Sequence, residues 1–382
     1  MRKATIAALI LLVASLFLAS CQPSTIVTTP VPTVSSTASP KASSAWDNTV
    51  AAAKQEGKLV ISTSNTPPVR EAIAKAFKDR FGIEIEYIGG GKGSELAAKL
   101  LAERDAGLFN QDIYIGGTTT ILTVLKPVGA VDSMESMLML PGVLDKKLWM
   151  GGDYLWSDAG HTIMVILAMP NPGESIVVNT NKVKTGEIKV YDDIINPKWK
   201  GQIVLNDPTI QGAGQRFVGG VATKVKNWDY MVSLAKLEPT INRDQRLQIE
   251  SVAKEKYAIG LGIEPNLVTE FLQAGAPIVE ILPQDDFTLS AGPNDMAVIN
   301  KAAHPNAAKV FVNWILDKEG QTVLSKAGGL ASIKTDVPTD HLTPQRRLDP
   351  SKKYFVIDSE AYIVTEPASI AKAKEIFGPL MK

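Results

Sequence analysis

Helix and strand patterns alternate along the first third of the chain. Short apolar runs, typical of buried strands, take turns with segments in which apolar residues recur every three to four positions, as on one face of a helix. The expected elements are, in order, a helix over 47–56, a strand over 59–61, a helix over 67–81, a strand over 83–88, a helix over 95–106 and a strand over 112–115. This order predicts an α/β fold with a parallel, doubly wound sheet.

Each of these expected strands runs into a polar loop at its carboxyl end. Ser64-Asn65 follows the first strand, Gly91-Lys92 lies in the glycine-rich loop after the second, and Thr118-Thr119 follows the third. Ligands of open α/β sheets bind at this edge, where helix N-termini present N–H groups and a positive dipole end that favour anions. The glycine-rich loop lacks the Gly-Lys-Ser/Thr of a P-loop, and glycines also serve plain turns. We expect ligand contacts from these loops.

The N-terminus carries the pattern of an export signal. Arg2 and Lys3 precede an apolar run from Ala4 to Leu18, and the run ends in Leu-Ala-Ser-Cys at 18–21. The run is shorter than the ~18–20 apolar residues that a transmembrane helix needs. Leu-Ala-Ser-Cys resembles a bacterial lipobox, which implies a signal peptide over 1–20 and a lipidated Cys21 as the mature N-terminus. The alternative is a chance cysteine within a signal peptide.

The segment after Cys21 is rich in proline, serine and threonine up to Ala45. Such a composition offers too little apolar surface to offset the entropy that ordering would cost. We therefore expect residues 21–45 to form a lipidated, disordered spacer in front of the folded body.

Composition limits what the folded body can be. The residues from Trp46 onward are too many for one ordinary core, so at least two lobes are expected. Lys and Arg balance Asp and Glu at 40 each, which argues against a nucleic-acid partner. Cys21 is the single cysteine, so disulfides and thiolate metal sites are excluded. No later stretch is long and apolar enough to cross a membrane.

Three motifs from residue 175 onward give the chain a family resemblance. They are Ser-Ile-Val-Val-Asn-Thr-Asn at 175–181, Asn-Pro-Lys-Trp-Lys-Gly at 196–201 and His-Pro-Asn-Ala-Ala-Lys at 304–309. In combination they resemble the extracellular solute-binding proteins of ABC importers, in the branch of ferric-iron, thiamine, polyamine, phosphonate and sugar-phosphate binders. The resemblance covers about residues 46–329.

Two of these motifs also have a direct physical interpretation. Trp199 is an aromatic anchor that can hold the loop after Pro197 on its lobe. His304 is expected to support a helix start, because the residues after it form a buried stripe at helical spacing. That stripe comprises Ala307, Phe311, Ile315 and Leu324.

The resemblance implies a two-lobed type 2 periplasmic-binding-protein fold, in which a hinge closes an interlobe cleft on the ligand. The implied parts are a first lobe over 46–175 plus 288–340, a second lobe over 176–287, and C-terminal helices over 341–382 that pack on the body. The same resemblance implies that strand ends of the second lobe face the cleft as well. Its candidate ligand residues are Asp207, Gly212, Gly214 and Glu264, which follow the expected strands 203–205 and 258–263.

Other polar residues are weaker candidates for the ligand site. Arg243 is expected to be a surface or interlobe charge, and His161 a structural residue in a rim loop. Lys92 and the glycine-rich helix starts favour an anion, whereas Asp207 and Glu264 favour an amine. A small anionic or zwitterionic solute reconciles both signs.

Ferric iron is an alternative ligand. Ferric-binding relatives commonly carry adjacent tyrosines near the position that reads Ile-Glu-Pro at 263–265 here. The sequence has no Tyr-Tyr pair, and Tyr257 stands alone nearby. Carboxylates without phenolates form a different kind of site. No metal site and no cofactor are therefore expected.

An enzyme and a sensor are the remaining alternatives. A secreted hydrolase would need a nucleophile, yet the chain has no Gly-x-Ser-x-Gly, no His-Glu-x-x-His and no cysteine besides Cys21. A binding lobe that reports to a membrane sensor would look the same as an importer subunit. The expectation is thus an extracytoplasmic monomer, anchored to the membrane by its lipid, that captures a small-molecule solute for an ABC permease.

Overall fold

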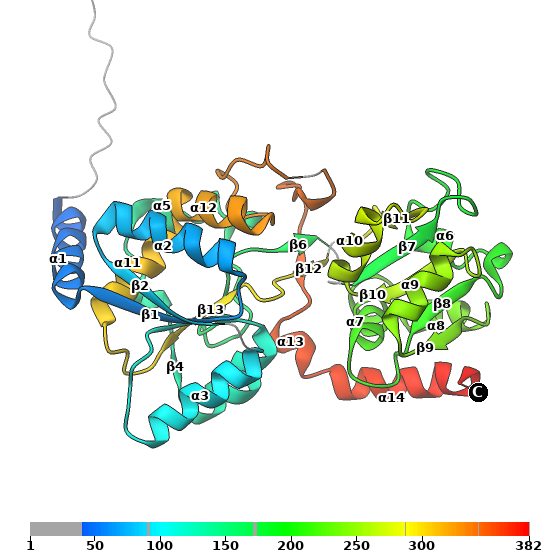
Figure 1. Cartoon of the computed structure of the whole chain (residues 1–382), viewed down its shortest axis with the longest axis horizontal. Coiled ribbons are helices and arrows are strands. Elements are labelled where there is room, and N and C mark those ends of the chain that lie inside the picture. Colours follow the sequence, from blue (N-terminus) through cyan, green and yellow to red (C-terminus); the bar gives the residue numbers. More distant parts are fainter. Residues whose placement is uncertain (1–39, 90–91, 171–173, 287, 343, 382) are drawn as a thin grey trace, which may run out of the picture. The chain divides into compact units, whose positions relative to one another are not determined.

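The computed structural model describes residues 40–381 except 90–91, 171–173, 287 and 343 (Figure 1). None of its described helices is long and apolar enough to span a membrane. Cys21 and Gly91 lie outside the described residues.

A first sheet is built mainly from the N-terminal part of the chain. Its strand order is β2-β1-β3-β13-β4, with β5 pairing with β13. The strands are β1 (Lys58–Thr63), β2 (Glu84–Gly89), β3 (Ile113–Gly116), β4 (Val131–Asp132), β5 (Met164–Val165) and β13 (Asp295–Ile299). β1 is parallel to both β2 and β3, so the expected parallel βαβαβ arrangement is confirmed. β13 returns from far along the chain and runs antiparallel to β3.

Helices cover both faces of this sheet because each face carries its own apolar cluster. The helices are α1 (Pro40–Glu56), α2 (Pro67–Phe81), α3 (Gly93–Asp105), α4 (Thr118–Thr120), α5 (Pro141–Leu144), α11 (Pro305–Leu316) and α12 (Lys318–Gly328). Phe77 of α2 meets Phe311 and Trp314 of α11, with ring centroids 5.4 and 5.3 Å apart. On the other face, Leu96 and Leu100 of α3 join a second cluster. The expected stripe on α11 and α12 is confirmed, since all its members are fully buried.

The first helix differs from the expectation. α2 has the expected bounds and ends at Gly82, which adopts a left-handed φ of 72°. α1, however, begins at Pro40 and not at Asp47, so residues 40–45 belong to a helix and not to the spacer. Proline is accepted in a first helical turn because its missing N–H would be unpaired there anyway.

A second sheet has the strand order β11-β7-β10-β8-β9. The strands are β7 (Ser175–Asn179), β8 (Ile203–Asn206), β9 (Thr240–Asn242), β10 (Ile259–Ile263) and β11 (Ile278–Ile281). Its helices are α6 (Tyr191–Ile194), α7 (Ala213–Gly220), α8 (Trp228–Ala235), α9 (Gln245–Ala253) and α10 (Pro265–Gln273). Trp199 is buried in the core of this sheet and donates its indole N–H to the carbonyl of Asp193 at 3.0 Å, as expected of an anchor.

A small third sheet joins three passages of the chain. β6 (Met169–Pro170) precedes β7, β12 (Thr288–Ser290) follows β11, and β14 (Phe355–Val356) precedes the last helices. These helices are α13 (Glu360–Ile363) and α14 (Glu366–Phe377). α14 packs against α7, and its Ala373 and Phe377 are buried in the core of the second sheet.

Candidate functional site

The first sheet brings its predicted ligand residues to one edge. Thr63 at the end of β1 pairs with Gly89 of β2 on one side and Ile115 of β3 on the other. Because the three strands are parallel, the residues after them leave the same edge. Ser64, Asn65, Lys92, Thr118 and Thr119 therefore lie together at the carboxyl edge of the first sheet.

These residues differ in how free their side chains are. Asn65 is buried and its backbone N–H donates to the Thr63 hydroxyl at 3.0 Å, which closes the turn after β1. Lys92 is exposed, and its ammonium group makes no ion pair within the described part of the chain. Ser64 is half-buried and Thr119 is exposed, so both remain accessible to a ligand.

Thr118 is buried and holds a partner within the fold. Its hydroxyl donates to Asp295 at the start of β13, and Ser157 donates to the other carboxylate oxygen at 2.6 Å. Asp295 is fully buried, and burial raises its pKa to about 7. The side chain of Thr118 thus fixes β13 at this edge, a role that sequence separation hid.

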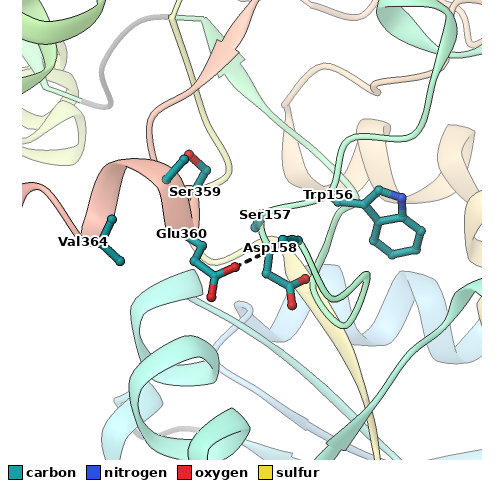
Figure 2. A pocket seen from close by; sticks show the side chains of 8 residues that line it. Trp156, Ser157, Asp158, Ser359, Glu360 and Val364 are labelled. Atoms are coloured by element: carbon teal, nitrogen blue, oxygen red, sulfur yellow. Dashed lines mark hydrogen bonds between the residues drawn. The ribbon is translucent and has the colours of Figure 1, made fainter.

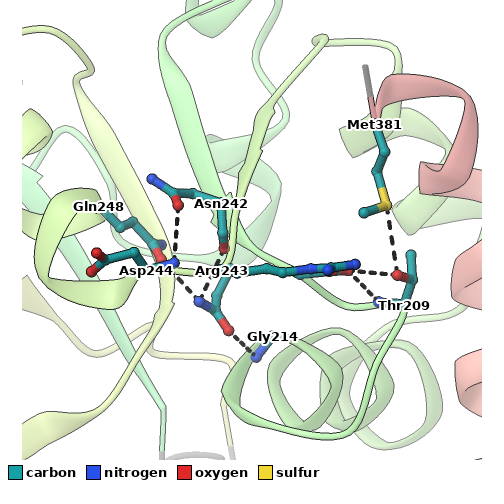
Figure 3. A network of polar contacts seen from close by, with 9 residues as sticks. Thr209, Gly214, Asn242, Arg243, Asp244, Gln248 and Met381 are labelled. Carbon is teal, nitrogen blue, oxygen red and sulfur yellow. Dashed lines mark hydrogen bonds and ion pairs between the residues drawn. The ribbon is translucent and has the colours of Figure 1, made fainter.

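The second sheet gathers its candidates at an edge of its own. β8, β9 and β10 are parallel to one another, so Asp207, Arg243 and Glu264 follow adjacent strand ends. Figure 3 shows the polar network that results around Arg243 and Thr209. The sequence predicts that Asp207 and Glu264 lie at this edge. Arg243 is exposed, as predicted for a surface charge, and it also pairs with Asp207.

Asp207 is fully engaged within this network. One carboxylate oxygen accepts from the Thr209 backbone N–H at 2.8 Å and hydroxyl at 2.7 Å, and the other accepts from Arg243 Nε at 2.8 Å. Burial alone would raise the pKa of Asp207, but the hydrogen bonds from Thr209 and Arg243 hold it below its usual range. The carboxylate is therefore already neutralised, while the Arg243 side chain remains exposed.

The two predicted glycines form a tight entry to α7. Gly212 has a φ of 147°, a backbone conformation that favours glycine, and it precedes the first residue of the helix. Gly214 donates its N–H to the Asn206 side-chain oxygen at 3.0 Å, and a Cβ at this position would overlap the Asn206 carbonyl. Both glycines thus let α7 begin directly against the end of β8.

Glu264 is an exposed carboxylate at the carboxyl end of β10, and its charge acts on Arg216. It is exposed at the start of α10, and its side chain makes no hydrogen bond or ion pair with the residues described. Its backbone N–H donates to Gln245 Oε1 at 2.7 Å, which fixes the turn after β10.

An ion pair between the half-buried Arg216 and the buried Glu174, beside β7, was not among the sequence candidates. Arg216 of α7 donates its Nε to Glu174 at 2.6 Å, and Glu174 is only 1% exposed. Burial raises the pKa of Glu174, and the Arg216 charge opposes that rise. The charge of Arg216 also reaches Asp358, a carboxylate that accepts from the Ser290 hydroxyl at 2.5 Å and the Ala291 N–H at 3.0 Å. No local sequence signal links residues so far apart in the chain.

A cavity of about 440 Å³ lies between the segment around Asp158 and the start of α13, as Figure 2 shows. Its lining residues include Trp156, Ser157, Asp158, Ser359 and Glu360. Lys126 bridges Asp158 at 2.8 Å and Glu360 at 3.1 Å, so both carboxylates already have a counter-ion.

The two histidines of interest have structural contacts. His161 stacks on Trp156 with ring centroids 4.8 Å apart and contacts Glu135 at 2.8 Å. His304 precedes α11, and its Nδ1 lies 2.8 Å from the buried carboxylate of Asp112. These contacts fit the structural roles that the sequence predicts for His161 and His304.

Within the described residues, no group of three or more His, Cys, Asp or Glu side chains is arranged to hold a metal ion. Tyr257, the lone tyrosine near β10, uses its hydroxyl to contact Thr240 at 2.9 Å.

Comparison with known proteins identifies relatives over most of the chain. The family model of bacterial extracellular solute-binding proteins matches residues 72–347. An uncharacterized protein of Haemophilus influenzae is 25% identical over 325 residues, which are 82% of this chain and 88% of that protein. An uncharacterized ABC transporter extracellular-binding protein of Pyrococcus horikoshii is 26% identical over 203 residues, 51% of this chain and 40% of that protein.

Solved structures share the fold at low sequence identity. The periplasmic binding protein AfuA of Actinobacillus pleuropneumoniae, bound to fructose-6-phosphate, is 21% identical with a TM-score of 0.53. A Trichodesmium protein (IdiA, FutA) in complex with iron and citrate is 16% identical with a TM-score of 0.61. Each match covers 84% of this chain and 99% of the other chain. They show a two-lobed α/β fold of the periplasmic-binding-protein type.

Proposed function

The chain belongs to the family of bacterial extracellular solute-binding proteins of ABC transporters, and from this premise we propose that it captures a small anionic or zwitterionic solute between its lobes. The first lobe comprises 46–175 plus 288–340, the second lobe comprises 176–287, and residues 341–382 pack on the body. Ligand contacts in both lobes stabilise the closed state by the difference in affinity between closed and open forms. The closed protein then delivers its solute to a membrane permease.

One observation carries the choice of solute: Lys92 and Glu264 bear opposite charges that no described residue pairs. Lys92 belongs to the edge of the first sheet and Glu264 to the edge of the second. Asp207, in contrast, is ion-paired with Arg243, so its charge is already balanced within the protein. A positive group at the edge of one sheet and a negative group at the edge of the other suit a ligand that has an anionic part and a cationic or hydrogen-bonding part.

The direct contacts that we propose come from both edges. They are Ser64, Asn65, Gly91, Lys92 and Thr119 on the first, and Gly212, Gly214 and Glu264 on the second. Thr118 and Asp207 take part indirectly: Thr118 fixes β13 through Asp295, and Asp207 fixes the turn at Thr209. The protein performs no chemistry on the solute, because capture and release require only lobe closure.

Native mass spectrometry with metal analysis of the purified protein tests this function. We expect one organic molecule of low mass per chain, retained in the wild type and reduced in occupancy in Lys92→Ala and Glu264→Ala. Loss of one charged contact typically weakens binding by about ten-fold or more. Lys99→Ala on the outer surface of α3 is the matched control and should retain the solute.

Two results would contradict the proposal. Stoichiometric iron would favour the ferric alternative, with carboxylate ligands in place of a tyrosine pair. Equal solute occupancy in the wild type and in both variants would reject this site assignment.

A further inference from the structure

We propose that the anionic group of the solute is received at the end of β2 by the guanidinium of Arg70, with the hydroxyl of Tyr87 as a second donor. This inference rests on the proposed function, because it names the part of the solute that one wall of the site recognises. Neither residue follows the end of a strand, so the loop pattern did not select them.

Arg70 is a cation without a counter-ion. It lies in the first turn of α2 and is half-buried, yet its guanidinium makes no hydrogen bond or ion pair within the described part of the chain. A cation at a helix N-terminus is repelled by the positive end of the helix dipole. The other arginine of α2, Arg80, lies in the last turn and pairs with Glu319 at 3.4 Å. An anion bound to Arg70 would relieve the repulsion and use its donors.

Gly89 places this guanidinium at the ligand edge. A Cβ on Gly89 would overlap Nη1 of Arg70, so the missing side chain is what lets the guanidinium lie over the last residue of β2. Gly89 pairs with Thr63, the residue that precedes Ser64 and Asn65. Arg70 therefore belongs to the same edge as the candidate residues of the first sheet.

Tyr87 offers a donor that the fold leaves unused. Its hydroxyl is buried and has no hydrogen-bond partner in the described residues. Buried polar groups are nearly always paired, so such a group calls for a partner that the fold itself does not supply. Burial also raises the pKa of Tyr87, so the hydroxyl stays protonated and can donate to an anion.

Arg70 and Tyr87 line the same cavity of about 200 Å³, together with Pro67, Glu71 and Ala74. This volume has room for a phosphate, phosphonate or carboxylate group. The start of α2 offers the anion its dipole but few backbone N–H donors. Pro67 and the proline after it have no N–H, and the N–H groups of Val69 and Arg70 both donate to the Thr66 carbonyl at 3.1 Å. Side chains must therefore supply the donors.

Glu71 gives the proposal a second, opposite test. It is exposed and lines the same cavity, so its negative charge repels an anion there. Replacing Glu71 with glutamine removes the charge while keeping the size of the side chain. Anion affinity should then increase.

Calorimetric titration of inorganic phosphate into the full chain tests the inference. We expect Arg70→Ala to weaken phosphate binding by about ten-fold or more, Tyr87→Phe to weaken it by a smaller factor, and Glu71→Gln to strengthen it. Arg80→Ala is the matched control from the same helix and should bind phosphate as the wild type does. Thermal unfolding confirms that each variant is folded, and Tyr87→Phe should unfold like the wild type because its hydroxyl has no partner to lose.

The outcomes separate this inference from the proposed function. Equal phosphate affinity of Arg70→Ala and the wild type, or no phosphate binding by the wild type, overturns the role of Arg70. If Arg70→Ala then still retains the co-purified organic solute, the proposed function stands without it. If no solute is retained by any form of the protein, the proposed function fails, while the phosphate titration still decides the role of Arg70.

Discussion

Asp295 shows how a single residue can be shaped by the whole fold. Its carboxylate is fully buried at the edge of the first sheet and accepts hydrogen bonds from Thr118 and Ser157. Burial raises its pKa to about 7, and the negative charges of Asp358 and Asp158 add to the rise. The folded protein therefore holds the Asp295 proton more tightly than the unfolded chain, whose carboxyl has the ordinary pKa of 3.8.

This difference predicts a pH-dependent stability. Because the folded state binds the proton more tightly, the contribution of Asp295 to stability is complete below the unfolded pKa of 3.8 and decreases as the pH rises to about 7. In Asp295→Asn this dependence is absent. The free energy of unfolding of the wild type, minus that of Asp295→Asn, should therefore fall by roughly 2–4 kcal/mol between pH 4 and pH 7.

Urea unfolding of both proteins at several pH values measures this difference. Asp105→Asn is a suitable control, because Asp105 is exposed at the end of α3 and makes no hydrogen bond or ion pair with its side chain in the described part of the chain. A constant difference between wild type and Asp295→Asn across this pH range would show that Asp295 keeps an ordinary pKa.

At the scale of elements, close backbone approach sets the position of α7. Gly214 lies in the first turn of the helix, against the carbonyl of Asn206 at the end of β8. Only a residue without a Cβ allows this approach, and the amide of Asn206 accepts the Gly214 N–H in return. The position of Arg216 and its pair with Glu174 depend on the same helix.

Gly214→Ala should therefore destabilise the protein, by about 1–3 kcal/mol, because the new methyl group forces the helix away from the strand. Solute binding should weaken as well, since Gly212 and Arg216 move with α7. Gly378→Ala provides the control: Gly378 has helical dihedral angles and open space around its Cβ position. Thermal unfolding of both variants tests the difference, and equal stability would show that α7 can shift without cost.

At the scale of the whole molecule, the apolar residues form separate cores on the first and second sheets. The small third sheet connects these two parts of the chain. The cluster on one face of the first sheet includes residues of α11, and the cluster on the other face includes Ala297 and Ile299 of β13. Ala373 and Phe377 of α14 complete the core of the second sheet. The three strands of the third sheet come from the three passages that connect these parts. Hinge closure of the kind proposed would bend few backbone segments and leave both cores intact.

Membrane anchoring also concerns the whole molecule, and it depends on Cys21. We expect Cys21→Ser, expressed as the full chain in bacteria, to appear in the soluble fraction, since the multiple acyl chains of a bacterial lipoprotein are what would hold the protein at the membrane. Palmitate labelling with membrane fractionation measures this directly. Membrane retention of unlabelled Cys21→Ser would contradict the lipobox interpretation.

The sequence by itself determined the order of elements and the location of the ligand loops. Apolar periodicity predicted α2 to the residue, and it predicted β1, β2, β3 and α3 with shifts of one or two residues. Periodicity is a local property, because a buried face imposes its own spacing on the segment that forms it. For the same reason the local pattern predicts structural roles for Trp199 and His304, and their contacts support these roles.

Tertiary structure alone decided which polar side chains are free. Thr118 and Asp207 follow strand ends, as Ser64 and Glu264 do. Within the fold, however, Thr118 is hydrogen-bonded to Asp295, and Asp207 is paired with Arg243. Arg70, Tyr87 and Gly89 come together only when α2 packs on the edge strand. The pairing of such groups depends on residues far apart in the chain, whose distances are set by packing and not by local pattern. A charge becomes available to a ligand only where the fold provides no partner for it.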